Sequence, residues 1–149
     1  MDETTKKAGE FLKELLKDFK FDLKVSAKKT AEGIYLDLKG EDVHLLLNES
    51  GELLDAFEVI LFQIYGKEIA KNERFICDAD GFRQTRKSEL QAMARFAAQN
   101  VRKSGSPFTF GKLNSTERRI IHLALQQEED LYTESVGEGK DRRLRVQLK

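Results

Sequence analysis

The hydrophobic positions in the first part of the chain follow a helical period and then a strand period. Apolar residues every three or four positions predict an amphipathic helix over residues 8–19, whose polar face carries both signs of charge. Strict alternation at 21–25 and again at 34–38 predicts two strands. The polar stretch between them, which ends at Gly33, predicts a loop of several residues.

Two more helical segments and a strand follow in this part. We predict a short helix over 42–47 and a longer one over 53–64, separated by the tetrapeptide 48–51. Alternation predicts a strand over 74–78, within which Cys77 is expected to be a small core residue. The predicted order is therefore helix, strand, strand, helix, helix, strand.

The second part begins at a glycine-containing hinge, residues 79–81, and continues as a long helix. This helix is predicted from Phe82 to about Lys103, because a glycine and the single proline of the chain follow at 104–107. Asn114 and Glu117 have the spacing of a capping box, which predicts a helix over residues 115–126. Three short strands complete the prediction: 108–110, 131–136 and 142–148.

The composition is that of a folded domain and excludes several classes of protein. The chain has 149 residues, 40% hydrophobic and 35% charged, with a mean hydropathy of −0.54. No apolar run approaches the roughly 20 residues that span a bilayer, and the N-terminus has no apolar signal region. We therefore expect a cytoplasmic protein. One cysteine and two histidines argue against a disulfide framework or a structural zinc site, so we expect no metal and no cofactor.

The net charge of zero hides an asymmetry between the two parts. Residues 1–80 hold 12 Lys and Arg against 18 Asp and Glu, whereas residues 81–149 hold 14 against 8. A basic part of this kind favours a nucleic acid or another acidic partner. The alternative is that two small units have different solvated surfaces. The long helix carries a basic track, formed by Arg83, Lys87, Arg95 and Arg102. This track is either a contact surface for a nucleic acid or an ordinary solvated helix surface.

Arg118 and His122 are the first candidates for chemistry. Four positions apart in the predicted helix, they lie about 40° apart on one face, with Ile120 and Ile121 on the other side. An exposed arginine and histidine can contact adjacent phosphates, or the histidine can stack on a base. This spacing alone is common on solvated helices, so the surrounding sequence is needed to decide whether the two residues bind a ligand.

The surrounding sequence resembles the R-three-H domain, whose members bind single-stranded nucleic acid. The similar segments are residues 114–125, 133–139 and Arg142-Arg143. Their amino-acid sequences are similar to those of the bacterial Jag family, also called KhpB. The resemblance implies nucleic-acid contacts at Arg118, His122, Ser135, Gly137 and Arg143, with Arg119 and Arg142 as further phosphate ligands.

Residues 40–56 resemble the core of a type II KH domain. In that family a Gly-x-x-Gly loop with basic residues clamps about four nucleotides of single-stranded RNA. Here the loop is Asn48, Glu49, Ser50 and Gly51. We expect Asn48 to preserve the turn, since asparagine tolerates a left-handed backbone. A carboxylate at Glu49 repels phosphate, so we expect a KH-like scaffold with a weakened or lost groove.

The Jag resemblance extends from about Ala8 to Val146 and includes residues 78–86 between the two parts. It implies an α+β fold with a KH-like domain over 1–80 and an R-three-H domain over 81–149 that includes the linking helix. Typical Jag proteins carry a further N-terminal domain, and this chain starts at the KH helix.

The leading hypothesis is an RNA-binding protein that holds single strands through the R-three-H part. The alternative is an interaction module, in which the KH-like part forms a homodimer or a heterodimer with a small KH-only protein. No catalytic triad, carboxylate pair, phosphate-binding lysine loop or metal cluster is evident, so we do not expect an enzyme.

Overall fold

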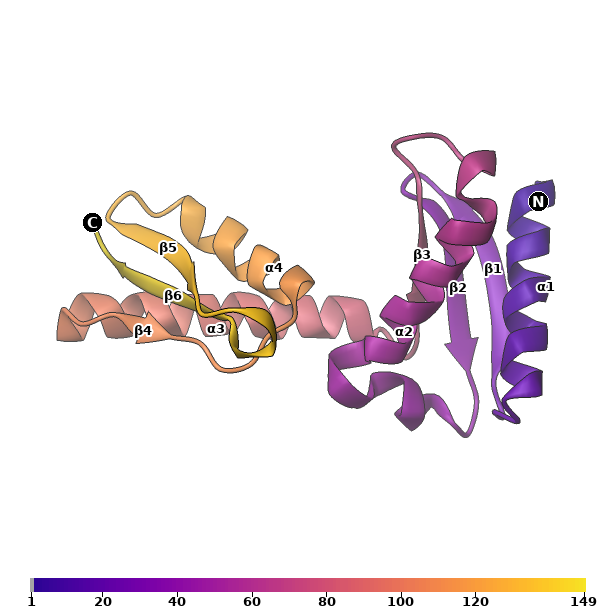
Figure 1. Cartoon of the computed structure of the whole chain (residues 1–149), viewed down its shortest axis with the longest axis horizontal. Coiled ribbons are helices and arrows are strands. Elements are labelled where there is room, and N and C mark those ends of the chain that lie inside the picture. The colour runs from indigo at the N-terminus through magenta and orange to yellow at the C-terminus, as the bar shows by residue number, and fades with distance from the viewer. Residues whose placement is uncertain (1) are drawn as a thin grey trace. The chain divides into compact units, whose positions relative to one another are not determined.

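The computed structural model describes residues 2–149, an α+β chain that divides into two compact units (Figure 1). Unit 1 ends at Arg83, and unit 2 comprises Gln84–Lys149. The helices are α1 (Glu3–Asp18), α2 (Val43–Tyr65), α3 (Phe82–Ser104) and α4 (Ser115–Gln126), with short 3-10 turns η1 (Gly66–Glu68) and η2 (Gly139–Asp141). The strands are β1 (Lys24–Thr30), β2 (Gly33–Lys39), β3 (Arg74–Asp78), β4 (Phe108–Thr109), β5 (Leu131–Val136) and β6 (Arg143–Leu148).

Unit 1 is a three-stranded sheet with both of its helices on one face. The strand order is β1-β2-β3, with β1 antiparallel and β3 parallel to the central β2. Ile34, Leu36 and Leu38 of β2 are fully buried, and they pack against α1 and α2 in one hydrophobic core. The residues between them, Tyr35 and Asp37, are only partly covered. The alternation in the sequence therefore reports a sheet covered on one face only.

The first strand is the element that the sequence misplaced. It begins at Lys24 and continues to Thr30, so the polar stretch expected as a loop is strand, and a two-residue turn leads into β2. Ser26 and Lys28 lie on the open face of the sheet, where polar residues are tolerated, while Ala27 packs against the core. The period of two thus continues through the polar residues, and the hydroxyl of Thr30 closes the turn by donating to the carbonyl of Gly33.

The predicted break inside α2 is present as a turn between two helical segments. Three consecutive residues have a left-handed backbone, with φ values of 53° at Glu49, 57° at Ser50 and 78° at Gly51. Asn48 is extended (φ −63°, ψ 150°), so the expectation that it would hold the left-handed position was wrong. Gly51 is required because a Cβ there would lie 2.6 Å from the ring of Phe82.

Unit 2 is a second three-stranded sheet, of order β4-β6-β5, with all strands antiparallel. Its core contains the apolar faces of α3 and α4. The fully buried members of that core are Leu90, Ala97, Val101, Ile121 and Val146. Phe110 is also buried, and Phe108 packs against the same cluster. Among the residues described, no helix has both the length and the apolar character needed to cross a bilayer.

Two arginines of the expected basic track on α3 are paired with carboxylates. The guanidinium of Arg83 lies 2.7 Å from Asp55 and 2.8 Å from Glu58, and its Nε donates to the carbonyl of Cys77. Arg102 pairs with Glu128 and Asp130 at 2.9 and 2.7 Å. Their charges are neutralised within the fold, so the track is interrupted at both positions. The contacts of Arg83 also show why the division between the units lies in the first turn of α3.

Candidate nucleic-acid interface

Helix α4 is fixed at its first turn by the capping box that the sequence predicted. The side chain of Asn114 accepts from the backbone N–H of Glu117 at 2.8 Å, and Glu117 accepts in turn from the N–H of Asn114 at 3.1 Å. Ile121 and Leu125 are buried in the core of unit 2. The face on the other side of the helix, which carries Arg118 and His122, is left partly or fully exposed.

That face of α4 lines a pocket of about 420 Å³ against β5 and the start of β6. We call it the α4 pocket. The structure brings five of the predicted contact residues together there: Arg118, Arg119, His122, Ser135 and Arg142. The other lining residues are Ser115, Thr133, Glu134 and Leu144.

The α4 pocket collects arginines that have no carboxylate partner. Half of the ten arginines in the chain make ion pairs within 4.0 Å, namely Arg74, Arg83, Arg86, Arg102 and Arg145. In residues 2–149 no such pair involves Arg118, Arg119 or Arg142. Glu134, the one carboxylate among the lining residues, is paired with Arg145 and also accepts from Gln147. The pocket is therefore positively charged.

Arg118 and His122 are each oriented by one neutral contact. Nη1 of Arg118 donates to the carbonyl of Leu113 at 2.6 Å, which leaves its other N–H groups for a ligand. Nδ1 of His122 contacts the hydroxyl of Thr133, and the ring is exposed. Neither side chain is buried and neither is bound to an acidic group, so both are available to an anionic ligand.

Gly137 and Arg143, also predicted as contact residues, do not line the α4 pocket. Gly137 has φ +84°, and a Cβ there would lie 2.8 Å from the carbonyl oxygen of Asp141. Arg143 donates to the carbonyls of Lys140 and Arg142 at 3.1 and 3.2 Å. Both residues shape the turn between β5 and β6, which places Arg142 at the pocket.

Ser115, Thr133 and Glu134 line the pocket and were not predicted. The sequence contains a signal for Thr133, because it lies two residues before Ser135 on the same face of β5. Glu134 is recognisable only from its position opposite Arg145 on the neighbouring strand. That position depends on the register between β5 and β6. That register is not contained in the local pattern.

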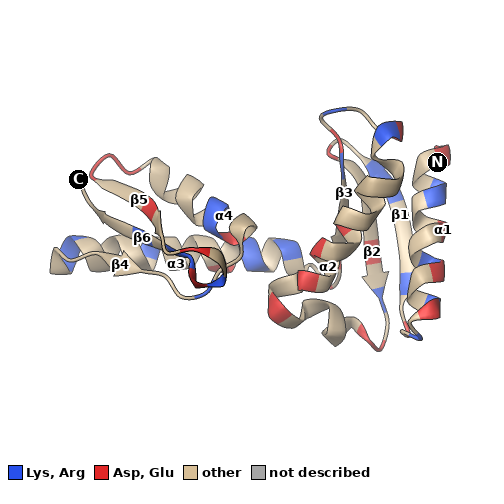
Figure 2. Ribbon diagram, in the orientation of Figure 1, with Lys and Arg blue, Asp and Glu red and all other residues tan. Residues whose placement is uncertain are grey.

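The loop over 48–51 lies in acidic surroundings. Helix α2 carries Glu49, Glu52, Asp55 and Glu58 and no lysine or arginine (Figure 2). Asp55 and Glu58 are paired with Arg83, whereas Glu49 and Glu52 are exposed. The three left-handed residues form a tight turn, but the accessible charges around it are negative.

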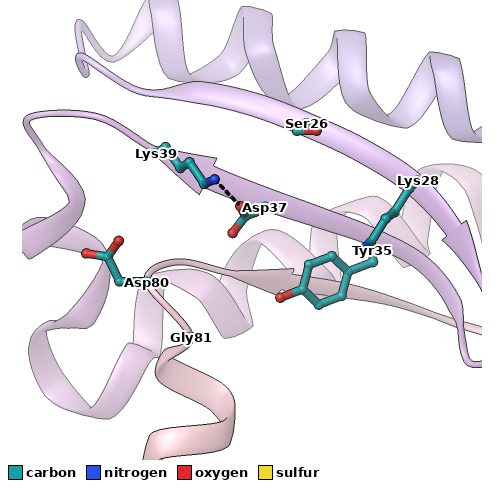
Figure 3. Close-up of a pocket in the computed structure, with 7 residues that line it drawn as sticks. All are labelled: Ser26, Lys28, Tyr35, Asp37, Lys39, Asp80 and Gly81. Atoms are coloured by element: carbon teal, nitrogen blue, oxygen red, sulfur yellow. Dashed lines mark ion pairs between the residues drawn. The ribbon is translucent and has the colours of Figure 1, made fainter.

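A second pocket, of about 430 Å³, lies on the open sheet face of unit 1 (Figure 3). Lys39 pairs with Asp37 at 3.6 Å, and the ammonium of Lys28 lies 5.3 Å from the centre of the Tyr35 ring. With Asp80 also at its edge, the lining holds two cations and two carboxylates. These charges balance one another, so the pocket has no excess charge for a phosphate ligand.

Metal and thiol chemistry have no support in the described part of the chain. Residues 2–149 contain no group of three or more His, Cys, Asp or Glu side chains that could hold a metal ion. Cys77 is buried, and burial raises the pKa of its thiol well above the usual range, the opposite of what a reactive thiolate needs. Cys77 is thus the core residue that the sequence predicted.

Comparison with known proteins finds one similar domain family for residues 88–148 and similar proteins for most of the chain. Residues 88–148 match the R-three-H domain. Over 145 residues the chain is 30% identical to the RNA-binding protein KhpB of Clostridium symbiosum. The aligned region covers 96% of this chain and 65% of that protein. It is 27% identical over 127 residues to the RNA-binding protein KhpB of Bacillus subtilis strain 168, covering 84% of this chain and 61% of that one. The chain thus spans less than two thirds of the length of these curated relatives.

Proposed function

Because the chain is a homologue of the KhpB proteins with an R-three-H domain at residues 88–148, we propose that it binds single-stranded RNA in the α4 pocket. The observation that carries this proposal is the convergence of three arginines without carboxylate partners and one exposed histidine on a single pocket. The RNA ligand is inferred from the names of the two relatives.

Arg118, Arg119 and Arg142 would hold the phosphates of the strand. A guanidinium presents several N–H donors in one plane, which suits the oxygens of a phosphate. Each contact also displaces condensed cations from the strand, so affinity should fall steeply with salt. Glu134 does not oppose this, since Arg145 already neutralises it.

His122 and Ser135 would contact sugar or base atoms beside the phosphates. Both are exposed, and both lie at the pocket. The residues that line the pocket include no phenylalanine or tyrosine on which a base could stack. Since base-edge contacts provide sequence discrimination and phosphate contacts provide none, we infer a phosphate-dominated interaction with modest sequence preference.

The functional division that we propose is a KH-like domain over 1–80 and an R-three-H domain over 81–149. Unit 1 has the element order and mixed sheet expected of a type II KH domain, which supports this assignment. We infer that the loop of Asn48, Glu49, Ser50 and Gly51 does not hold a strand, because the carboxylates of Glu49 and Glu52 would repel its phosphates.

The test is a binding titration of the whole chain against a fluorescently labelled single-stranded RNA at several salt concentrations. The double variant Arg118→Ala/His122→Ala should bind more weakly, and loss of one phosphate contact should flatten the slope of log K against log salt by about 0.7. Arg74→Ala removes the same charge from an exposed position in unit 1, outside the pocket, and is the matched control. An unchanged slope in the double variant would contradict the proposed site.

A second candidate function is protein docking by unit 1. It is favoured by the apolar side chains of Val59 and Phe62 on α2, each of which is 56% exposed. The occupant would be a second copy of this chain or a small KH-only protein. Sedimentation of the whole chain tests the first case. Self-association that Val59→Glu/Phe62→Glu abolishes would support docking of a second copy, and a monomer at all concentrations would contradict that case.

A further inference from the structure

Arg86 on α3 and Glu117 on α4 form an ion pair in unit 2. Nε of Arg86 lies 2.5 Å from Oε2 of Glu117, across 31 positions of sequence. The side chain of Glu117 is only 6% exposed and that of Arg86 is 25% exposed. Nη1 of Arg86 also donates to Glu89 on its own helix at 3.1 Å, which fixes the plane of the guanidinium.

Glu117 uses its two carboxylate oxygens for different purposes. Oε1 accepts from the backbone N–H of Asn114 and completes the capping box, while Oε2 accepts from Arg86. A buried carboxylate is strongly disfavoured unless a cation and hydrogen-bond donors surround it. Burial alone would lower the pKa of Arg86, but its hydrogen bonds to Glu117 and Glu89 raise it overall, so the guanidinium keeps its positive charge. The capping box is thereby attached to α3.

The first turn of α4, which Glu117 attaches to α3, also contributes residues to the α4 pocket. Glu117 directly precedes Arg118, whose backbone N–H donates to the carbonyl of Asn114 at 3.0 Å. Ser115, Arg118 and Arg119 all line the pocket from this turn. Arg86 itself is absent from the lining and is bound to two carboxylates. A shift of the first turn would therefore move two phosphate ligands at once.

We propose that Arg86 is a positioning residue for RNA binding: through Glu117 it fixes the first turn of α4, and with it the guanidinium groups of Arg118 and Arg119. This inference rests on the proposed function of the α4 pocket. It assigns Arg86 no contact with the RNA.

The first test compares three variants of the whole chain in the RNA titration, at a temperature where circular dichroism shows each to be folded. Arg86→Met should bind about tenfold more weakly, the size of a typical coupling between neighbouring residues. In Arg86→Met/Glu117→Gln the buried charge is gone and glutamine can still complete the capping box. This double variant should recover affinity to within about threefold of the original chain. Arg74→Met, which removes an arginine from an exposed ion pair with Glu32 in unit 1, should change affinity by less than about twofold.

The second test needs no RNA and separates the two proposals. In a ¹⁵N–¹H spectrum of the free chain, Arg86→Met should shift the backbone amides of Asn114, Glu117 and Arg118, and the double variant should return them toward their original positions. If the original chain binds no RNA but the amides respond in this way, the proposed function fails, while the attachment of the first turn of α4 to Arg86 stands. If folded Arg86→Met binds RNA as tightly as the original chain, or leaves these amides unmoved, the positioning role is wrong.

Discussion

His122 on α4 and Thr133 on β5 are in direct contact through Nδ1 of the imidazole and the threonine hydroxyl. The contact connects the helix to the neighbouring strand across the α4 pocket. It occupies Nδ1 and leaves Nε2 as the ring nitrogen available to a ligand. Thr133 thus fixes the orientation of His122.

Thr133→Val should weaken RNA binding about fivefold, because a net hydrogen bond is worth about 1 kcal/mol and the imidazole would be free to rotate. Valine keeps the shape and the strand preference of threonine, so β5 should remain intact. The measurement is fluorescence anisotropy with a labelled single-stranded RNA. Thr109→Val, at an exposed position on β4, is the control. Equal affinity of both variants would show that the contact does not orient a binding group.

Gly137→Ala should destabilise unit 2 by about 2 kcal/mol, since it combines a left-handed backbone with a steric overlap. The added Cβ would lie 2.8 Å from the carbonyl oxygen of Asp141 at a φ of +84°. Gly139 provides the control, because its φ is also positive, +57°, but nothing lies within 4 Å of a Cβ there. Gly139→Ala should therefore cost about 1 kcal/mol, from the backbone alone.

Urea unfolding followed by circular dichroism measures both glycine variants. A larger decrease in the free energy of unfolding for Gly137→Ala than for Gly139→Ala would confirm that the turn is closely packed against Asp141. Similar losses would mean that only the positive φ matters. Because the turn carries Arg142 to the pocket, Gly137→Ala should also weaken RNA binding.

The fold was largely predictable because most elements carry sequence signals at their own ends. The capping box of Asn114 and Glu117 marked the start of α4, and Gly105 with Pro107 marked the end of α3. The strand β1 was misplaced because Ser26 and Lys28 face solvent on a sheet covered on one side, so polarity was mistaken for a loop. Local patterns report burial, and here they failed because the covered face of β1 has only the small side chain of Ala27 between these two polar residues.

The candidate site was predictable only as far as one helix and its family resemblance extend. The spacing of Arg118 and His122 placed both on one face, and the predicted relation to KhpB is confirmed by the comparisons. The contacts from other elements were missed, such as Thr133 on His122 and Arg86 on Glu117. These depend on the packing of elements far apart in sequence, which no local pattern contains.

The hydroxyl of Tyr35 should ionise at a higher pH than the usual tyrosine pKa of about 10. Partial burial, and then the hydrogen bond that it donates to Asp78 at 2.9 Å, raise the pKa of Tyr35 from 10 to about 12. Absorbance at 295 nm during an alkaline titration should show a late phase near pH 12, and Tyr35→Phe should lack it. Because the folded pKa is raised, the stabilisation is complete below pH 10 and is lost as the pH rises from 10 to about 12. Tyr65→Phe, which should retain the late phase, is the control.

For the loop over 48–51 we predict a substitution that increases RNA binding, whereas the variants above decrease binding or stability. Its turn is already formed, with Glu49 in a left-handed backbone at φ 53° and exposed to solvent. If charge rather than shape prevents a strand from binding there, reversing that one charge should create a phosphate contact. Glu49→Lys should therefore raise RNA affinity severalfold and steepen the salt slope by up to about 0.7, the value for one added contact on a single strand.

Glu10→Lys makes the same change of charge at an exposed position of α1 and serves as the control for Glu49→Lys. A general electrostatic effect would raise affinity equally in both variants, whereas a contact at the loop would raise it in Glu49→Lys alone. Asn48→Gly/Glu49→Lys, which restores the first glycine of the KH pattern, should bind no better than Glu49→Lys. The reason is that Asn48 is extended, with φ −63° and ψ 150°, and gains nothing from the freedom of glycine. A further increase in the double variant would show that the shape of the turn also limits binding.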